Sequence, residues 1–155
     1  MKMLIALDFS PIGREAAEGG YRYGRQLGAD VTFLHIVPAI ASPLEGYNMH
    51  FYITPEARST EEKVRAAAAE KVNLLVEEIK KEYGEMPAGQ KCDIRVNVAD
   101  NPGSEIVRVA DSERYDTIVI GNKGYTTLER VILGSTALKV VNQAKCSVWL
   151  YRHPR

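Results

Sequence analysis

The chain has 155 residues, of which 45% are hydrophobic and 26% charged, as expected for one globular domain rather than a disordered chain. Twenty basic residues balance twenty acidic ones, so no net field exists to hold a polyanion, and we expect no nucleic-acid partner. Cys92 and Cys146 form no CxxC motif, which argues against a disulfide scaffold or a zinc site and favours the reducing cytoplasm. The first apolar run, Met3 to Leu7, is too short for a signal peptide or a membrane span, so no membrane association is expected.

The first part of the chain predicts two buried strands around a helix. Met3 to Leu7 is a continuous apolar run, typical of a buried parallel strand. Ser10 as N-cap predicts a helix over Pro11 to Leu27, which has proline at its first position and small residues that would let it lie close to a sheet. Gly28 is the expected C-cap of this helix. Val31 to Val37 is the second buried strand.

A long connection and a second helix follow. The segment from Pro38 to about Arg58 exceeds the usual length of a loop, and its aromatic cluster from Tyr47 to Tyr52 is expected to cover a ligand or to pack on a partner subunit. Ser59 and Glu62 form a capping box, which predicts that the helix starts at Ser59. The helix is expected to end at Gly84 and to pack one face, made of Val64, Ala68, Val72, Leu75, Val76, Ile79 and Tyr83.

The rest of the chain predicts three more strands and two more helices. Cys92 to Val98 alternates polar and apolar residues, which is typical of a half-exposed edge strand. Asn101 and Pro102 predict the start of a third helix. Thr117 to Ile120 is a fourth, buried strand, Ser135 to Ala144 a fourth helix, and Ser147 to Tyr151 a last strand at a sheet edge.

This alternation of strands and helices predicts an α/β fold. We expect a single-domain, Rossmann-like three-layer sandwich over residues 1–155, with a five-stranded parallel sheet and four helices. Sheets of this kind bind ligands outside the carboxyl ends of their strands, near the switch in strand order. The loops after the first, second and fourth strands are therefore the places where a site is expected.

Glycines after the fourth strand have a spacing that suits phosphate binding. Gly121 and Gly124 are followed, nine residues later, by Gly134 and Ser135 at the start of a helix. Glycines let backbone N–H groups approach an anion, and the helix start adds free N–H groups and the positive end of the helix dipole. The same residues would also serve as a turn, a surface loop and a helix cap.

Other nucleotide-binding and phosphoacceptor classes lack their signatures here. No GxxxxGK[ST] loop is present, and no GxGxxG follows the first strand, so a P-loop NTPase and a dinucleotide oxidoreductase are disfavoured. A phosphoacceptor receiver domain needs paired acidic residues after the first strand, whereas Asp8 stands alone. No catalytic residue and no metal-ligating residue stands out.

The glycine pattern G-x2-G-x9-G-[ST] after the fourth strand resembles the nucleotide-binding signature of the universal stress protein family, in its ATP-binding branch. The resemblance extends over LIALDFS, VTFLHIV, YDTIVIGNKG and LERVILGSTALKVVNQAKCSVWLYR, and so over nearly the whole chain. It implies the sheet order 3-2-1-4-5, an ATP site and a homodimer. It also implies a stress-response protein of the cytoplasm.

The resemblance assigns the site residue by residue. Asp8 matches an acidic residue that contacts the adenosine end, and Ile36 matches the apolar residue beside adenine. The phosphate and ribose positions, with their neighbours in the loop, fall on Gly121, Asn122, Lys123, Gly124, Gly134, Ser135 and Thr136. The Asn122-Lys123 pair departs from the family, in which Ser followed by His or Arg is commoner. Lys123 could contact phosphate or extend into solvent.

Two side chains near this site have structural interpretations beside the functional ones. Asp8 precedes Ser10 by two residues, so it could cap the first helix as well as contact a ligand. His35 lies within an apolar strand and is expected to be a hydrogen-bonded core histidine rather than a ligand or a base.

We therefore expect a cytosolic ATP-binding stress-response regulator or sensor, with slow or no ATP hydrolysis. The bound species would be ATP with Mg²⁺, or ADP or AMP. The alternative is a nucleotide-independent, dimeric interaction protein of the same fold. We expect a homodimer through Ser147 to Tyr151, an apolar strand without charge or proline, unless Trp149 packs inside its own subunit.

Overall fold

Strands and helices alternate along the whole described part of the chain. The computed structural model describes residues 1–39, 55–124 and 133–152, and only the backbone of residues 55–57. The elements are β1 (Lys2–Leu7), α1 (Pro11–Leu27), β2 (Asp30–Pro38), α2 (Pro55–Tyr83), β3 (Cys92–Ala99), α3 (Pro102–Ser112), β4 (Thr117–Gly121), α4 (Ser135–Gln143) and β5 (Ser147–Tyr151). The predicted alternation is confirmed.

One parallel sheet holds all five of these strands, in the order β3-β2-β1-β4-β5. In the register of the central strands, Leu7 at the end of β1 lies opposite His35 of β2, and Ala6 lies opposite Ile120 of β4. The chain extends the sheet to one side of β1 and then to the other, so the switch point lies between β1 and β4. The predicted fold and strand order are confirmed.

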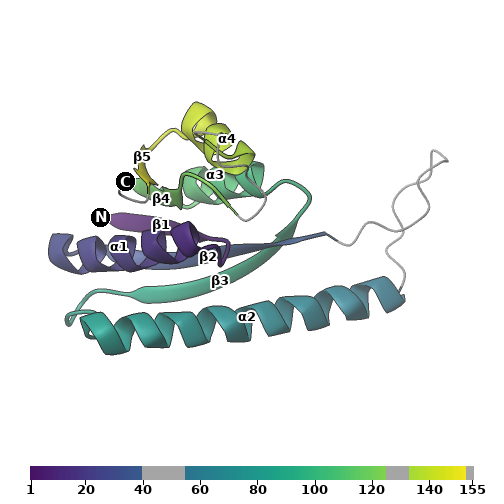
Figure 1. Ribbon diagram of the computed structural model, residues 1–155, viewed down its shortest axis with the longest axis horizontal. Helices are drawn as coiled ribbons and strands as arrows, with labels where there is room; N and C mark the ends of the chain where they lie inside the picture. Colours follow the sequence, from purple (N-terminus) through teal and green to yellow (C-terminus); the bar gives the residue numbers. More distant parts are fainter. Residues whose placement is uncertain (40–54, 125–132, 153–155) are drawn as a thin grey trace.

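Helices cover both faces of the sheet and form three layers (Figure 1). α1 and α2 pack on one face, over a core that contains Met3, Ile5 and Phe33. α3 and α4 pack on the other face, over a core that contains Leu4, Leu34 and Ile118. Successive residues of β1 alternate between the two cores, because side chains of a strand point alternately to its two faces.

α1 lies close to the sheet because its inner face carries glycine and alanine. A side chain at Gly20 would come within 2.8 Å of the Ile5 Cδ1 atom, and one at Gly24 would collide with Val31. Its ends are as predicted: the Ser10 side chain accepts a hydrogen bond from the Gly13 N–H, and Gly28 closes the helix in the left-handed conformation at φ 67°.

The predicted start of α2 is wrong. The helix begins at Pro55 rather than Ser59, so the Ser59–Glu62 pattern lies inside the helix and caps nothing. Proline suits the first helical turn, where its missing N–H has no intrahelical acceptor. The extra turn carries α2 past the end of β3 (Figure 1). Val64, which was predicted to pack, is 42% exposed, whereas Val72, Leu75, Val76 and Ile79 are buried as predicted.

The connection between β2 and α2 is shorter at both ends than predicted. β2 continues to Pro38 and α2 starts at Pro55, so 39–54 is the connection. The aromatic cluster from Tyr47 to Tyr52 and most of the stretch between Gly124 and Gly134 lie outside the described residues.

Candidate functional site

A pocket of about 470 Å³ opens at the carboxyl ends of β1, β2 and β4, at the switch in strand order. All the sequence-predicted site residues line it except Asn122; the lining ones are Asp8, Ile36, Gly121, Lys123, Gly124, Gly134, Ser135 and Thr136. Residues more than 120 positions apart in the chain are thus brought to one cavity, as a parallel α/β sheet requires.

Asn122 lies behind the pocket and joins its two glycine segments. Its side chain is buried, its backbone carbonyl accepts a hydrogen bond from the Gly134 N–H at 2.8 Å, and its own N–H donates to the Tyr151 carbonyl at 2.7 Å. The start of α4 and the end of β5 are therefore both tied to the loop that follows β4.

One wall of the pocket is apolar. Ala6, Leu34, Ile36 and Ile120 contribute from three strands, and Ile106 contributes from α3. Pro38 and Pro102 close the wall where β2 ends and α3 begins. This surface can bury a flat apolar group such as a nucleobase, which gains free energy by leaving water.

The opposite end of the pocket is built from backbone and small side chains. Gly134 is the N-cap of α4, and no side chain of the described residues accepts a hydrogen bond there. By contrast, Ser10 and Asn101 cap α1 and α3 through their side chains. The N–H groups of the first turn of α4, with the hydroxyls of Ser135 and Thr136 beside them, can therefore receive an anion.

The Asp8 carboxylate lies between the start of α1 and the glycine loop. Its Oδ1 atom accepts hydrogen bonds from the Ser10 N–H at 3.0 Å and the Ser10 hydroxyl at 2.6 Å. A Cβ at Gly124 would stand 2.6 Å from Oδ2, so glycine there makes room for the carboxylate. Asp8 thus holds the capping residue Ser10 rather than capping α1 itself, and its second oxygen faces the loop.

His35 of β2 makes a hydrogen-bond contact, as predicted, but it is half-buried rather than a core residue. Its Nδ1 atom lies 2.7 Å from the Leu7 carbonyl oxygen, and its ring packs against Phe9 with centroids 4.7 Å apart. It lies beside the pocket and does not line it.

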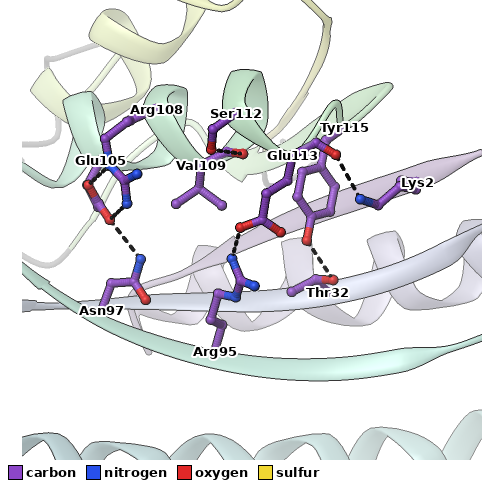
Figure 2. A network of polar contacts seen from close by, with 10 residues as sticks. All are labelled: Lys2, Thr32, Arg95, Asn97, Glu105, Arg108, Val109, Ser112, Glu113 and Tyr115. Carbon is purple, nitrogen blue, oxygen red and sulfur yellow. Dashed lines mark hydrogen bonds and ion pairs between the residues drawn. The ribbon is translucent and has the colours of Figure 1, made fainter.

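A polar network pins α3 to β3 and so fixes one wall of the pocket (Figure 2). The Asn97 amide donates to the Glu105 carboxylate at 2.7 Å, and Arg108 donates to the same carboxylate. These hydrogen bonds, that from Arg108 above all, lower the pKa of Glu105. Arg95 pairs with Glu113, which directly follows α3. The sequence reasoning missed the contribution of Pro102 and Ile106, although the position of this helix after a strand of the same sheet could have indicated it.

A smaller cavity of about 160 Å³ lies where α3 ends and β5 begins. The Lys145–Asp111 ion pair, 2.8 Å long, lies at its rim, and Cys146 is half-buried there. Burial raises the pKa of the Cys146 thiol, as it raises that of Cys92 to about 11. Burial therefore disfavours the thiolate, which is the nucleophilic form, at both cysteines.

The sequence as a whole matches one family model. The model of the universal stress protein family covers residues 1–152. The chain belongs to the universal stress protein family. Universal stress protein MJ0531 from Methanocaldococcus jannaschii is 30% identical over 158 residues, which cover 99% of this chain and 83% of that protein.

Solved structures share the fold. Universal stress protein UspA from Lactobacillus plantarum aligns with a TM-score of 0.74 at 23% identity, covering 98% of this chain and 97% of that one. A universal stress protein in complex with cAMP aligns at 0.61 and 16% identity, covering 98% and 96%. The universal stress protein of Archaeoglobus fulgidus in complex with dAMP aligns at 0.59 and 20% identity, covering 98% of each chain.

Two further features concern metals and membranes. Within residues 1–39, 55–124 and 133–152, no three His, Cys, Asp or Glu side chains come together as a metal-binding group. In the same part of the chain, no helix combines the length and the apolar character needed to cross a bilayer.

Proposed function

We propose that this member of the universal stress protein family is a regulator or sensor that binds an adenine nucleotide, ATP in the first place, in the pocket at the switch point. The proposal rests on one observation: the same cavity has an apolar wall at one end and a glycine loop with the start of α4 at the other. An apolar wall at Ile36 suits a base, and a glycine loop with an uncapped helix start suits phosphate.

The residues present fit such a ligand. A cavity of about 470 Å³ falls within the range of small-molecule sites. Gly121 and Gly134 present backbone rather than a side chain to the pocket, and Lys123 is the cation among the described lining residues. Two proteins of the same fold are described with cAMP and with dAMP, so the fold accommodates adenine nucleotides. The proposal includes a Mg²⁺ ion that accompanies the phosphates.

The proposal includes slow hydrolysis or none. The carboxylate that lines the pocket, Asp8, already binds the N–H and the hydroxyl of Ser10 through one oxygen, and a general base must reach the attacking water. We expect turnover far below the median enzyme value of about 10 per second. A phosphate-release assay with ATP and Mg²⁺ measures it, and rapid multiple turnover would show an enzyme instead.

The direct test identifies the ligand that the protein carries. We expect denaturation of the purified protein to release an adenine nucleotide, which mass spectrometry identifies as ATP, ADP or AMP. Calorimetric titration of nucleotide-free protein with each of the three should then show binding, and inorganic phosphate serves as the control without a base. An absence of binding at millimolar nucleotide would favour the alternative, an interaction protein whose glycines serve only turns.

The proposal also places a homodimer at the β5 edge, in a protein of the cytoplasm. β5 ends the sheet, and Trp149 and Leu150 are 36% and 38% exposed on it. Leu138 and Val141 of α4, a helix that contacts β5, are exposed as well. Trp149 packs edge-on against Tyr23 of α1, with ring centroids 5.3 Å apart, and stays partly exposed. The cysteines of the described residues are free thiols, which suits a reducing compartment.

A further inference from the structure

Phe9 has a backbone conformation that phenylalanine rarely adopts. Its φ is 62°, in the left-handed region where a side chain is strained. Among the described residues other than glycine, only Arg114 shares a positive φ. Phe9 stands directly after Asp8, which lines the proposed nucleotide pocket, so the strain is located at the candidate site.

The strained residue closes a turn that fixes the Asp8 carboxylate. The Ser10 N–H and hydroxyl both donate to Asp8 Oδ1, so the side chain of Asp8 bonds to the backbone two residues later, with Phe9 between them. This leaves Oδ2 directed at the place where a Gly124 side chain would stand. If Phe9 moved to an ordinary φ, the turn would open and the carboxylate would lose its fixed direction.

The ring of Phe9 is held on the side of the sheet away from the pocket. It packs against the His35 ring, with centroids 4.7 Å apart, and the Lys71 ammonium lies 4.4 Å from its centroid. His35 is itself fixed by its Nδ1 contact with the Leu7 carbonyl. The ring belongs to the core formed with α1 and α2, and Phe9 is not a lining residue of the pocket.

We propose that Phe9 is a positioning residue for the nucleotide site: its ring, packed between α2 and the end of β2, maintains the left-handed turn that directs the Asp8 carboxylate into the pocket. The inference rests on the proposed function and adds to it a residue that does not touch the ligand. The packing of the Phe9 ring offsets the strain at its own backbone. The Asp8 carboxylate is therefore already directed into the pocket before a nucleotide binds.

The test separates the ring from the backbone conformation. Phe9→Ala removes the ring and keeps the penalty on positive φ, whereas Phe9→Gly and Phe9→Asn remove the ring but tolerate that conformation. Affinity for AMP is measured by calorimetry, and fold integrity by urea denaturation. We expect Phe9→Ala to weaken AMP binding about tenfold, because the competent turn is then populated only part of the time. The glycine and asparagine variants should stay within about threefold of the unmodified protein.

The possible outcomes distinguish a positioning role of Phe9 from a merely structural one, and either of these from a failure of the proposed function. All three variants lose the packing of the ring, and Phe9→Ala also keeps the penalty on positive φ, so a merely structural role would lower the urea midpoints, most for alanine, and leave no difference in affinity between alanine and glycine. Unchanged AMP binding by Phe9→Ala, or equal weakening in all three, would overturn the positioning role and leave the proposed function standing. An unmodified protein that bound no nucleotide would overturn both. Should Phe9→Ala not fold, Phe9→Leu takes its place: leucine loses the ring contacts with His35 and Lys71 and still disfavours positive φ, so AMP binding should weaken, although less than in the alanine variant because part of the apolar volume remains.

Discussion

Single residues at the pocket are constrained by how closely backbone approaches the Asp8 carboxylate. Side chains at Gly13 and at Gly124 would both collide with it, from the start of α1 and from the loop after β4. The carboxylate cannot swing aside freely, because its Oδ1 atom is hydrogen-bonded to Ser10. Glycine at 124 is therefore required by the protein itself, in addition to any approach of a phosphate.

Gly124→Ala should disturb nucleotide binding through Asp8. The new Cβ would meet Oδ2 at 2.6 Å, so either the carboxylate or the loop must shift. We expect ATP affinity to fall about tenfold, or about 1.4 kcal/mol, with a small change in the urea midpoint. The control is a double-mutant cycle with Asp8→Ala, in which the same alanine should cost less because its neighbour is gone. Equal costs in both backgrounds would refute the steric account.

The sequence indicated this site in part. The glycine spacing and the place of Asp8 after an apolar strand depend on local pattern, and the residues they indicated line one pocket. Phe9 could not be found in this way, because a positive φ on phenylalanine leaves no mark in composition or periodicity. Ile106 and Pro102 come from α3, and their contribution depends on how that helix crosses the sheet.

At the scale of elements, α1 depends on small residues that face the sheet. Gly20 lies against Ile5 and Val119, and Gly24 lies against Val31 and Met3. Glycine inside a helix costs about 1 kcal/mol relative to alanine. These two positions therefore lower the stability of the isolated helix but let α1 lie close to the sheet. The start of the helix then lies close to Asp8, because a side chain at Gly13 would collide with the carboxylate that lines the pocket.

Gly24→Ala should destabilise the protein although alanine is the better helix former. The added methyl would collide with Val31, which is fully buried, and overpacking of a core costs about 1–3 kcal/mol. We expect a net loss in the free energy of unfolding of about 1 kcal/mol or more, measured by urea denaturation. Gln26→Ala, at an exposed position of the same helix, is the control and should stay within about 0.5 kcal/mol. Stabilisation by Gly24→Ala would show that the sheet yields at this position.

Helix ends show where local sequence rules suffice and where they do not. α1 begins and ends as predicted, because Ser10, Pro11 and Gly28 act through hydrogen bonds and dihedral angles of their own. The predicted start of α2 was wrong, because Ser59 and Glu62 can also occupy a helix interior. The helix instead begins at Pro55, four residues before Ser59. Val64 has the same helical periodicity as the buried residues of α2 and is nevertheless exposed, because periodicity does not report where along a helix the packing ends.

At the scale of the whole molecule, the two edges of the sheet differ in chemistry. β3 carries Asp93 and Arg95, and charges on an edge strand discourage pairing with another chain. β5 reads Ser-Val-Trp-Leu-Tyr, without charge or proline, and is the shorter edge. If two copies associate through a sheet edge, the β5 edge is the one suited to it.

Hydrogen bonding along β5 shows which groups are available to a partner. The Ser147 N–H donates to the Asp116 carbonyl and the Tyr151 carbonyl accepts from Asn122, so odd-numbered residues face β4. In a parallel strand, backbone groups of alternate residues point to opposite sides. Val148 and Leu150 therefore direct their N–H and C=O groups outward, where antiparallel pairing with a second copy would use them.

Leu150→Pro should convert the proposed dimer to a monomer while leaving the fold in place. Proline removes an outward N–H and obstructs an approaching strand, yet takes no hydrogen bond from the ladder with β4, since that side belongs to the odd-numbered residues. Sedimentation velocity at micromolar concentration measures the result: the unmodified protein should sediment as a dimer and the variant as a monomer. Leu150→Ala keeps the N–H and removes most of the apolar side chain, so it separates loss of the ladder from loss of buried area. A monomeric unmodified protein, or a dimer that persists in Leu150→Pro, would exclude pairing through this edge.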